Sequence, residues 1–455
     1  MRATILITVV LLLTSSEILS GEPKRITLDE AVRIALRENY ELRSSYYDLN
    51  ARRWGLRNAV TQFFPRVTFS TVFTRVDETT FRNQNAPIEF IRQLYPDLNI
   101  PLIPRNSYSS DVTVTQPIYN GGSLWANLSA ARSGRNASVH AYSEAKLSTI
   151  LETKRAFFDV LRSEDLLDVW RKSVGLAEKY LESALHKRSL GMISNADVLR
   201  WKLQLAENRT GLIEAENSVV IASVAFSKTI GAELDAEFEL DHLSEDQIER
   251  TVETVGLGLD DDFDRQETRW KEEALANSPA LKSVQAASSV ERALYRQKYS
   301  LFQPSVNFNY RYMWQADDDL RLDGLETWRA SVILSFPLFS SLGDYTSLKE
   351  ARDDLLSAEA SEREFERTVL LQVVSTASKL RSALRQVDAA GISRDLAREN
   401  AKIVEDKFGQ GLIDNLNLID AQVAQTTAEA RYVSAIYDFL IAQAEIDKLL
   451  GRQTY

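Results

Sequence analysis

The sequence predicts a mostly α-helical protein with a small β part, in which long coiled-coil helices and short strands are duplicated. An internal repeat and the placement of proline predict this fold. Matching residues lie 239 positions apart in the front of each copy and 220 apart in the rest, as in Pro65 with Pro304 and Gly191 with Gly411. A repeat this long indicates two structurally equivalent halves.

The first residues are expected to be a signal peptide rather than part of the fold. Met1-Arg2 is basic, Ile5 to Leu13 is apolar apart from one threonine, and small residues follow. This pattern is typical of a cleaved secretory signal and is too short for a membrane-spanning helix. We assign it residues 1–21. Because the chain contains no cysteine, packing rather than disulfides must stabilise it.

Two repeats are expected to flank an acidic linker. The first covers 22–231 as helix, two strands, long helix and short helix, and the second covers 267–455. The linker, 232–266, lies in a stretch from Ala232 to Thr268 that holds fourteen acidic residues and two arginines, a net charge of −12. The whole chain carries −11, so the remainder is nearly neutral. No basic face is visible, and nucleic acid is not expected as a partner.

Proline placement identifies the long helices. No proline lies between Pro117 and Pro279 or after Pro337, so uninterrupted helices are allowed there. The 68 residues from Ser123 to Leu190 would make a helix of roughly 100 Å. The segment from Tyr345 to Gln410 would make a second helix of nearly the same length. Helices of half that length are expected at 195–230 and 415–450 on the return, and at 28–63 and 267–301 at the start of each copy.

Capping patterns mark the helix ends. Thr27 and Glu30 have the spacing of a capping box. Gly191 and Gly411 each follow a long helix and are expected to end it, after which Ser194 and Asp414 can cap the returning helix.

Four strands per chain are expected between the starting and the long helices, at 66–76, 111–118, 306–313 and 327–338. Apolar and polar residues alternate over about ten residues, as in transmembrane barrel strands. Trp314 and Trp328 fall at strand ends, where an aromatic girdle would place them. Ordinary surface hairpins are the alternative. In lipid, four strands cannot close a barrel, so copies of the chain would have to share one. The proline-rich segment 77–110 is expected to be an irregular loop.

No catalytic or metal-binding chemistry is evident. The three histidines lie in no metal-ligand spacing, and no phosphate-loop pattern follows Gly121-Gly122. We expect no enzyme activity, no cofactor and no metal.

The chain resembles the TolC-like outer-membrane factor family. The resemblance rests on the order and recurrence of several motifs: Ile26 to Ala31 with Ala35-Leu36, the strand entries at Pro65 and Pro304, Gln116 to Gly122, Gly191 to Leu199 and Gly411 to Asp414. It implies a homotrimer with a 12-stranded β-barrel in the outer membrane of a Gram-negative-type bacterium and an α-helical tunnel through the periplasm. It also implies that the protein serves as the exit duct of a tripartite efflux pump or type I secretion system, together with a periplasmic adaptor and an inner-membrane transporter.

The resemblance also implies site residues. The adaptor would dock at the helical tips, formed by Gly191, Met192, Ile193, Ser194, Gly411, Leu412 and Ile413. An acidic ring would narrow the pore at Asp420, where the family pattern matches, with Asp414 and Asp197 near it; the other family position is Asn417, a departure. Positions of a charged latch in the family hold Ile413 and Phe408 here, so no such latch is expected. Residues of the strands expected to face the membrane are Phe69, Tyr310, Tyr312, Trp314 and Trp328.

Two other protein classes remain open from the sequence. A secreted or periplasmic structural coiled coil would not need four alternating strands in step with the repeat. A periplasmic adaptor subunit carries one helical hairpin in a β-rich body, whereas here the hairpin is duplicated and helix dominates.

Overall fold

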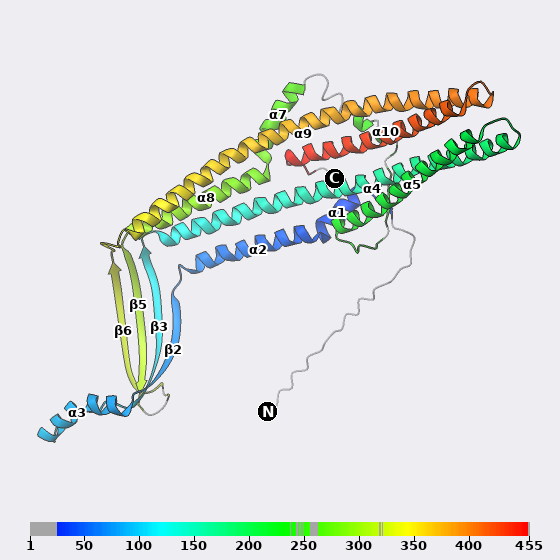
Figure 1. Cartoon of the computed structure of the whole chain (residues 1–455). Helices are drawn as coiled ribbons and strands as arrows, with labels where there is room; N and C mark the ends of the chain where they lie inside the picture. Colours follow the sequence, from blue (N-terminus) through cyan, green and yellow to red (C-terminus); the bar gives the residue numbers. More distant parts are fainter. Residues whose placement is uncertain are drawn as a thin grey trace, which may run out of the picture.

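The computed structural model describes residues 25–453, apart from 237, 243, 245–246, 249, 255–262, 318–319 and 321. The expected signal peptide, 1–21, and much of the acidic linker lie outside the described residues. The molecule is elongated, with a four-stranded sheet at one end and two helical hairpin tips at the other (Figure 1).

The two halves share an order of starting helices, two strands, a long helix and a returning helix. The first half contains β1 (Arg25–Ile26), α1 (Leu28–Glu38), α2 (Tyr40–Thr61), β2 (Arg66–Arg75), α3 (Glu78–Leu94), β3 (Asn106–Asn120), α4 (Ser123–Ser189) and α5 (Asn195–Ile230). The second contains β4 (Glu239–Leu240), α7 (Phe263–Asn277), α8 (Pro279–Tyr299), a 3₁₀ turn (Ser300–Phe302), β5 (Ser305–Ala316), β6 (Leu325–Ser335), α9 (Gly343–Gly409) and α10 (Asn415–Leu449). Both long helices have 67 residues, which confirms their predicted lengths within a few residues.

The starting helix of each half is broken, and the expectation of single helices at 28–63 and 267–301 was wrong. Asn39 adopts an extended conformation between α1 and α2. Its side-chain oxygen accepts a hydrogen bond from the Leu42 amide at 2.9 Å, and its side-chain nitrogen donates to the Thr229 carbonyl at 2.8 Å. In the second half, Ser278 interrupts the helix directly before Pro279 and caps α8. An N-capping side chain therefore ends one helix and begins the next.

We expected the segment 77–110 to be an irregular loop. This expectation was wrong in part, because the segment contains the helix α3. Asp77 caps this helix by accepting hydrogen bonds from the amides of Thr79 and Thr80 at 2.9 and 3.1 Å. Pro87 lies inside the helix and removes one backbone donor. The caps and the seventeen-residue length outweigh that loss.

The strands form one antiparallel sheet in the order β2-β3-β5-β6. Its central pair, β3 with β5, joins the two halves of the chain. β3 begins at Asn106, five residues before the expected strand, and its register with β5 shifts between Pro117 and Tyr119. β2 and β6 are the two edges. Among the described residues, no helix is both long and apolar enough to cross a membrane.

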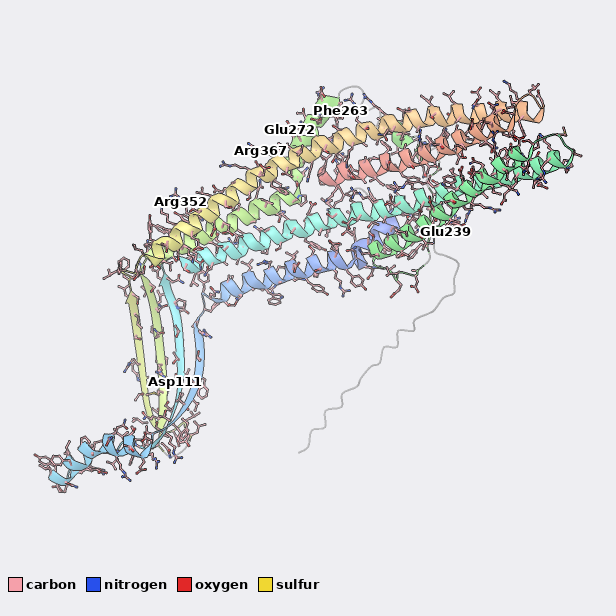
Figure 2. The ribbon with its side chains drawn as sticks, viewed as in Figure 1. Asp111, Glu239, Phe263, Glu272, Arg352 and Arg367 are labelled. Atoms are coloured by element: carbon pink, nitrogen blue, oxygen red, sulfur yellow. The ribbon has the colours of Figure 1, made fainter. Side chains whose placement is uncertain are left out.

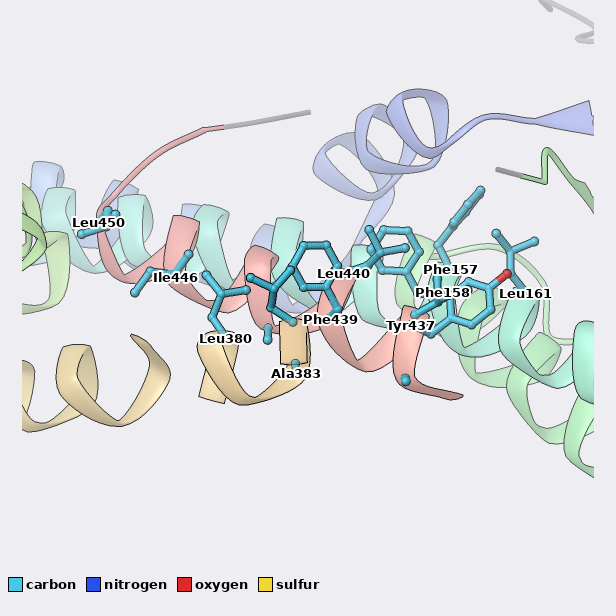
Figure 3. Close-up of a cluster of buried hydrophobic side chains, with 14 of the residues drawn as sticks. Phe157, Phe158, Leu161, Leu380, Ala383, Tyr437, Phe439, Leu440, Ile446 and Leu450 are labelled. Atoms are coloured by element: carbon cyan, nitrogen blue, oxygen red, sulfur yellow. The ribbon is translucent and has the colours of Figure 1, made fainter. Parts of the chain in front are cut away.

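The largest apolar core lies near the middle of the helical part, where the long, returning and starting helices meet (Figure 3). Phe157 and Leu161 of α4 contribute to it with Phe439 of α10 and Val373 of α9, and each is at most 1% exposed. Burying one such side chain contributes about 1.5–3 kcal/mol. The short parallel pair of β1 with β4 is attached beside this core through Ile26 and Leu240.

The two strand-to-helix junctions differ between the halves. In the first, Gly121 and Gly122 have left-handed backbone angles, with φ of 64° and 88°. A Cβ on Gly121 would lie 2.4 Å from the carbonyl oxygen of Ser300, so the two halves touch here through backbone. In the second, Ser341 and Leu342 occupy the matching positions with φ of 52° and 64°. The second junction therefore carries left-handed strain on residues with side chains.

The contact between Gly121 and Ser300 predicts a position-specific loss of stability. Replacing either Gly121 or Gly122 with alanine places a Cβ in a left-handed conformation, at a cost of about 1–2 kcal/mol. Only Gly121→Ala also meets backbone, since nothing lies within 4 Å of a Cβ on Gly122. Thermal unfolding followed by circular dichroism in detergent should give a lower melting temperature for Gly121→Ala than for Gly122→Ala. Equal melting temperatures would contradict the close approach.

Candidate functional site

The tip of the first hairpin is a tight turn between α4 and α5. After Ser189 the chain reverses at Gly191, and the amides of Gly191 and Met192 donate to the carbonyls of Arg188 and Lys187 at 2.9 Å. These bonds satisfy the last carbonyls of α4. Ser194 then caps α5 by accepting from the Asp197 amide at 3.3 Å. The predicted C-cap and N-cap are both confirmed.

The second tip repeats this turn between α9 and α10. The amides of Gly411 and Leu412 donate to the carbonyls of Phe408 and Lys407 at 3.1 and 2.9 Å. Asp414 caps α10 by accepting from the Asn417 amide at 3.1 Å. The two hairpins thus end in matched turns at the end of the molecule opposite the sheet (Figure 1).

A small core, which we call the tip core, joins the two hairpins behind their turns. Its buried members are Tyr180, Ala184, Val198, Trp201, Leu418 and Ile419. The Trp201 ring is fully buried, stacks on Tyr180 with centroids 5.2 Å apart, and donates its Nε1 proton to Asn415 Oδ1 at 3.4 Å. Burial raises the pKa of Tyr180, and nearby Glu405 adds to that effect. The tips are therefore one fixed surface rather than two independent loops.

Aromatic packing lies at one of the positions where family members carry a charged latch. Phe408 contacts the edge of Tyr180, with ring centroids 6.4 Å apart, and Lys187 lies 4.2 Å from the centre of the Phe408 ring. A cation over an aromatic face is attracted by the ring electrons. Contacts between the two hairpins here combine apolar packing and a cation–π contact with an ion pair of Lys179 and Glu405 at 3.4 Å.

The predicted docking residues differ in their accessibility. Met192 and Leu412 are each 68% exposed, whereas Ile193 and Ile413 are half-buried. Ile193 packs against the tip core. Met192 and Leu412 are thus the apolar members of this set that the tips present most to solvent.

Of the four residues predicted to line a pore constriction, three take part in helix caps. Asp197 Oδ2 accepts from the Ser194 amide and hydroxyl at 3.0 and 2.6 Å, and these bonds hold the pKa of Asp197 below its ordinary value. Asp414 Oδ1 accepts from the Asn417 side chain at 2.6 Å. Asp420 is exposed and makes no hydrogen bond or ion pair with the described residues. Of the three carboxylates, that of Asp420 is therefore the one without a capping bond.

The strand register places all five predicted membrane-facing residues on one face of the sheet. Phe69 lies opposite Val112, Val112 opposite Tyr312, and Tyr312 opposite Trp328. Tyr310 and Trp314 lie two residues to either side of Tyr312, so alternation puts them on the same face. We call this the apolar sheet face. It also carries Val67, Phe73, Val114, Phe308, Val332 and Leu334.

The opposite face is polar and contains an ion pair that the sequence reasoning missed. Asp111 of β3 (Figure 2) accepts from Arg311 of β5 at 2.7 Å, from Ser70 of β2 at 2.9 Å and from Thr113 at 2.8 Å. Three strands from both halves therefore meet at one buried carboxylate, which is 4% exposed. The sequence did contain a signal for this ion pair, because Asp111 and Arg311 are opposite charges on the polar sides of two predicted strands.

Comparison with known proteins identifies relatives along most of the chain. The model of the outer membrane efflux protein family matches residues 31–232 and 270–452. The chain is 23% identical over 359 residues to the outer membrane protein TolC of Vibrio cholerae, covering 76% of this chain and 78% of that protein. It is 22% identical over 351 residues to the alkaline protease secretion protein AprF of Pseudomonas aeruginosa, covering 75% and 69%.

The fold is also shared with a solved structure. The Campylobacter jejuni CmeC outer membrane channel superimposes with a TM-score of 0.78 at 16% identity, over 93% of this chain and 85% of that one. The chain therefore belongs to the outer membrane efflux protein family, as its TolC-like resemblance predicted, and is an outer-membrane protein that extends into the periplasm.

Proposed function

We propose that three copies of this chain form a single duct through the outer membrane, with a 12-stranded barrel above a helical tunnel. The observation that carries the proposal is the sheet itself, whose edge strands β2 and β6 have no neighbour beyond them in the described chain. Backbone groups at such edges must be paired in hydrocarbon, where no water can bond to them. Pairing between copies satisfies them.

Strand direction supports closure of this kind. Every neighbouring pair in the sheet is antiparallel, and the sheet has an even number of strands. The β6 edge of one copy can therefore pair antiparallel with the β2 edge of the next all the way round. Eight strands is the smallest number in known membrane barrels of this class, so one copy is too few. The family resemblance supports three copies.

The two sheet faces suit opposite sides of a barrel wall. The apolar sheet face would contact lipid, and Trp328 would lie in its aromatic girdle. The polar face, with Asp111 and Arg311, would line a water-filled interior. This arrangement also accounts for the aromatic pairs of the apolar sheet face, such as Tyr310 with Trp328 at 6.4 Å between centroids.

Exposed apolar seams on the helices support assembly below the barrel. Along α5 the exposed apolar residues include Leu199, Leu203, Ile213, Val220 and Val224, and along α9 they include Ile392, Leu396 and Ile403. Their spacings of four, seven and ten fit the a and d positions of a heptad repeat, as in a coiled-coil contact. Helices of neighbouring copies would cover these seams and complete the tunnel.

The duct would release cargo supplied by a partner system. We propose a tripartite efflux pump or a type I secretion system, in which a periplasmic adaptor docks on the tips and an inner-membrane transporter provides the energy. TolC, AprF and CmeC, the relatives named above, carry outer-membrane, secretion and channel descriptions. A structural coiled coil or an adaptor subunit leaves the two-faced sheet without a role.

The available carboxylate at Asp420 suggests a constriction at the tip end. Three Asp420 side chains brought together round a narrow opening would attract cations, as rings of acidic side chains do in channels. Asp197 and Asp414 would stand near this ring but with their oxygens engaged in caps.

Assembly is tested by mass and conductance. In detergent, light scattering should give a protein mass close to three times that of one mature chain, and the purified protein should form channels in planar bilayers. Leu203→Glu, in the α5 seam, should lower the melting temperature of the oligomer, because a charge would face the neighbouring copy. Lys202→Glu, at the adjacent exposed position, is the control. A stable monomer without channel activity would exclude the duct.

Docking is tested at the two most exposed tip residues. Met192→Asp together with Leu412→Asp should abolish export while leaving trimers intact, because a charged turn cannot bury against an apolar partner surface. Met192→Leu with Leu412→Met keeps the apolar character and should preserve export. The measurement is export or drug resistance in cells that lack the native chain. Normal export by the aspartate pair would remove the tips from this role.

The constriction is tested by single-channel recording. Asp420→Asn should weaken block by Mg²⁺ several-fold, since the ring would lose its three negative charges. Asp48→Asn, at an exposed carboxylate on α2, a helix that lies away from the tips (Figure 1), should leave the block unchanged. Block of equal strength in Asp420→Asn and the wild type would place the constriction elsewhere.

A further inference from the structure

The last turns of helix α3 have an apolar face that the described part of the chain does not cover. Pro87, Phe90, Ile91 and Leu94 are spaced three or four apart or adjacent, so they lie on one side of the helix. Phe90 is 63% exposed and Leu94 55% exposed. Tyr95, just past the helix end, is exposed as well. We call these five residues the α3 apolar face.

The opposite side of α3 is polar and is tied to the returning chain. Asn85, 1% exposed, donates from Nδ2 to the Ile103 carbonyl at 3.0 Å and accepts from the Ile103 amide at 2.7 Å. Glu78 forms an ion pair with Arg105 at 2.8 Å, and the Val76 amide donates to the Arg105 carbonyl at 3.0 Å. These bonds fix the orientation of α3, with its apolar face directed away from the returning chain.

The place of α3 in the fold indicates what this face contacts. Only two residues, Val76 and the capping Asp77, separate the helix from β2. At this end of the sheet, Phe73 and Tyr108 pair on the apolar sheet face with centroids 4.8 Å apart. Figure 1 shows α3 beyond the sheet, running across the strand direction. A helix in that position follows the plane of a membrane that the strands cross.

The distribution of charged residues on α3 also suits a lipid surface. Glu78 and Glu89 balance Arg82 and Arg92, so the helix carries no net charge, and all four lie away from the apolar face. An amphipathic helix with phenylalanine and leucine on one side and charges on the other is typical of helices in the membrane interface. The inference rests on the proposed function, because it needs the apolar sheet face to be in lipid.

We propose that α3 lies in the outer surface of the membrane beside the barrel, with the α3 apolar face buried among lipid acyl chains. Each trimer would then carry three such helices around the exit of the duct. They would anchor the barrel rim in the bilayer and leave the exit uncovered.

The absence of native cysteine allows a direct test with spin labels. Single variants Phe90→Cys and Leu94→Cys place a label on the apolar face, and Glu89→Cys and Gln93→Cys place one on the polar side. Each trimer is reconstituted in vesicles of phosphatidylethanolamine and phosphatidylglycerol. Accessibility to oxygen, which concentrates in lipid, is compared with accessibility to a water-soluble nickel complex. We expect the oxygen-to-nickel ratio to be several-fold higher at 90 and 94 than at 89 and 93.

Two further labels separate failure of this inference from failure of the proposed function. Phe69→Cys reports the apolar sheet face, and Met192→Cys, at a tip, reports water. A water-like ratio at 69 would overturn the barrel and the α3 inference together. A lipid-like ratio at 69 with a water-like ratio at 90 and 94 would overturn only the α3 inference, and would place α3 over the exit. Labels at 90 and 94 that neither reagent reaches would mean packing on a neighbouring copy, which also overturns it.

Discussion

The length of the long helices constrains the whole structure, because a helix of 67 residues cannot bury its apolar side against a single partner half as long. Each long helix solves it with two partners in succession. The returning helix covers the half of the long helix near the tips, and starting helices cover the half near the sheet. These starting helices come from both repeats, because α8 of the second repeat packs on α4 of the first as well as on α9. The large core forms where these partners meet. Neither repeat could bury its helices alone, which explains why the unit occurs twice in one chain.

The second tie between the repeats is the sheet. β3 and β5 are its inner strands and come from different halves, and Asp111 and Arg311 pair across them. The helices are thus joined at the tips, in the middle and at the strand end. Motion of one hairpin would have to disrupt the tip core or act on both halves together.

Features set by local chemistry could be predicted from sequence, and features set by distant partners could not. Gly191 and Gly411 end helices wherever they occur in such a turn, so the tips and their caps were predictable. The break at Ser278 had a local signal that was missed, because a serine directly before a proline is a helix-start pattern. The break at Asn39 has a local cap to Leu42, but its side chain is also held by the distant Thr229 carbonyl, which the sequence does not show. α3 was missed because prolines usually interrupt helices, whereas Pro87 is outweighed here by the Asp77 cap and by the bonds of Asn85. Trp201 and Asn415 lie 214 positions apart, and only folding brings them together.

The unequal junctions of the two halves have a consequence for which residues each half can hold. Where backbone from the other half lies against Gly121, a side chain has no room. Its counterpart Ser341 is exposed, as is Leu342, so side chains fit there although the backbone is left-handed in both halves. Equivalent positions of the two repeats therefore accept different residues according to what surrounds them.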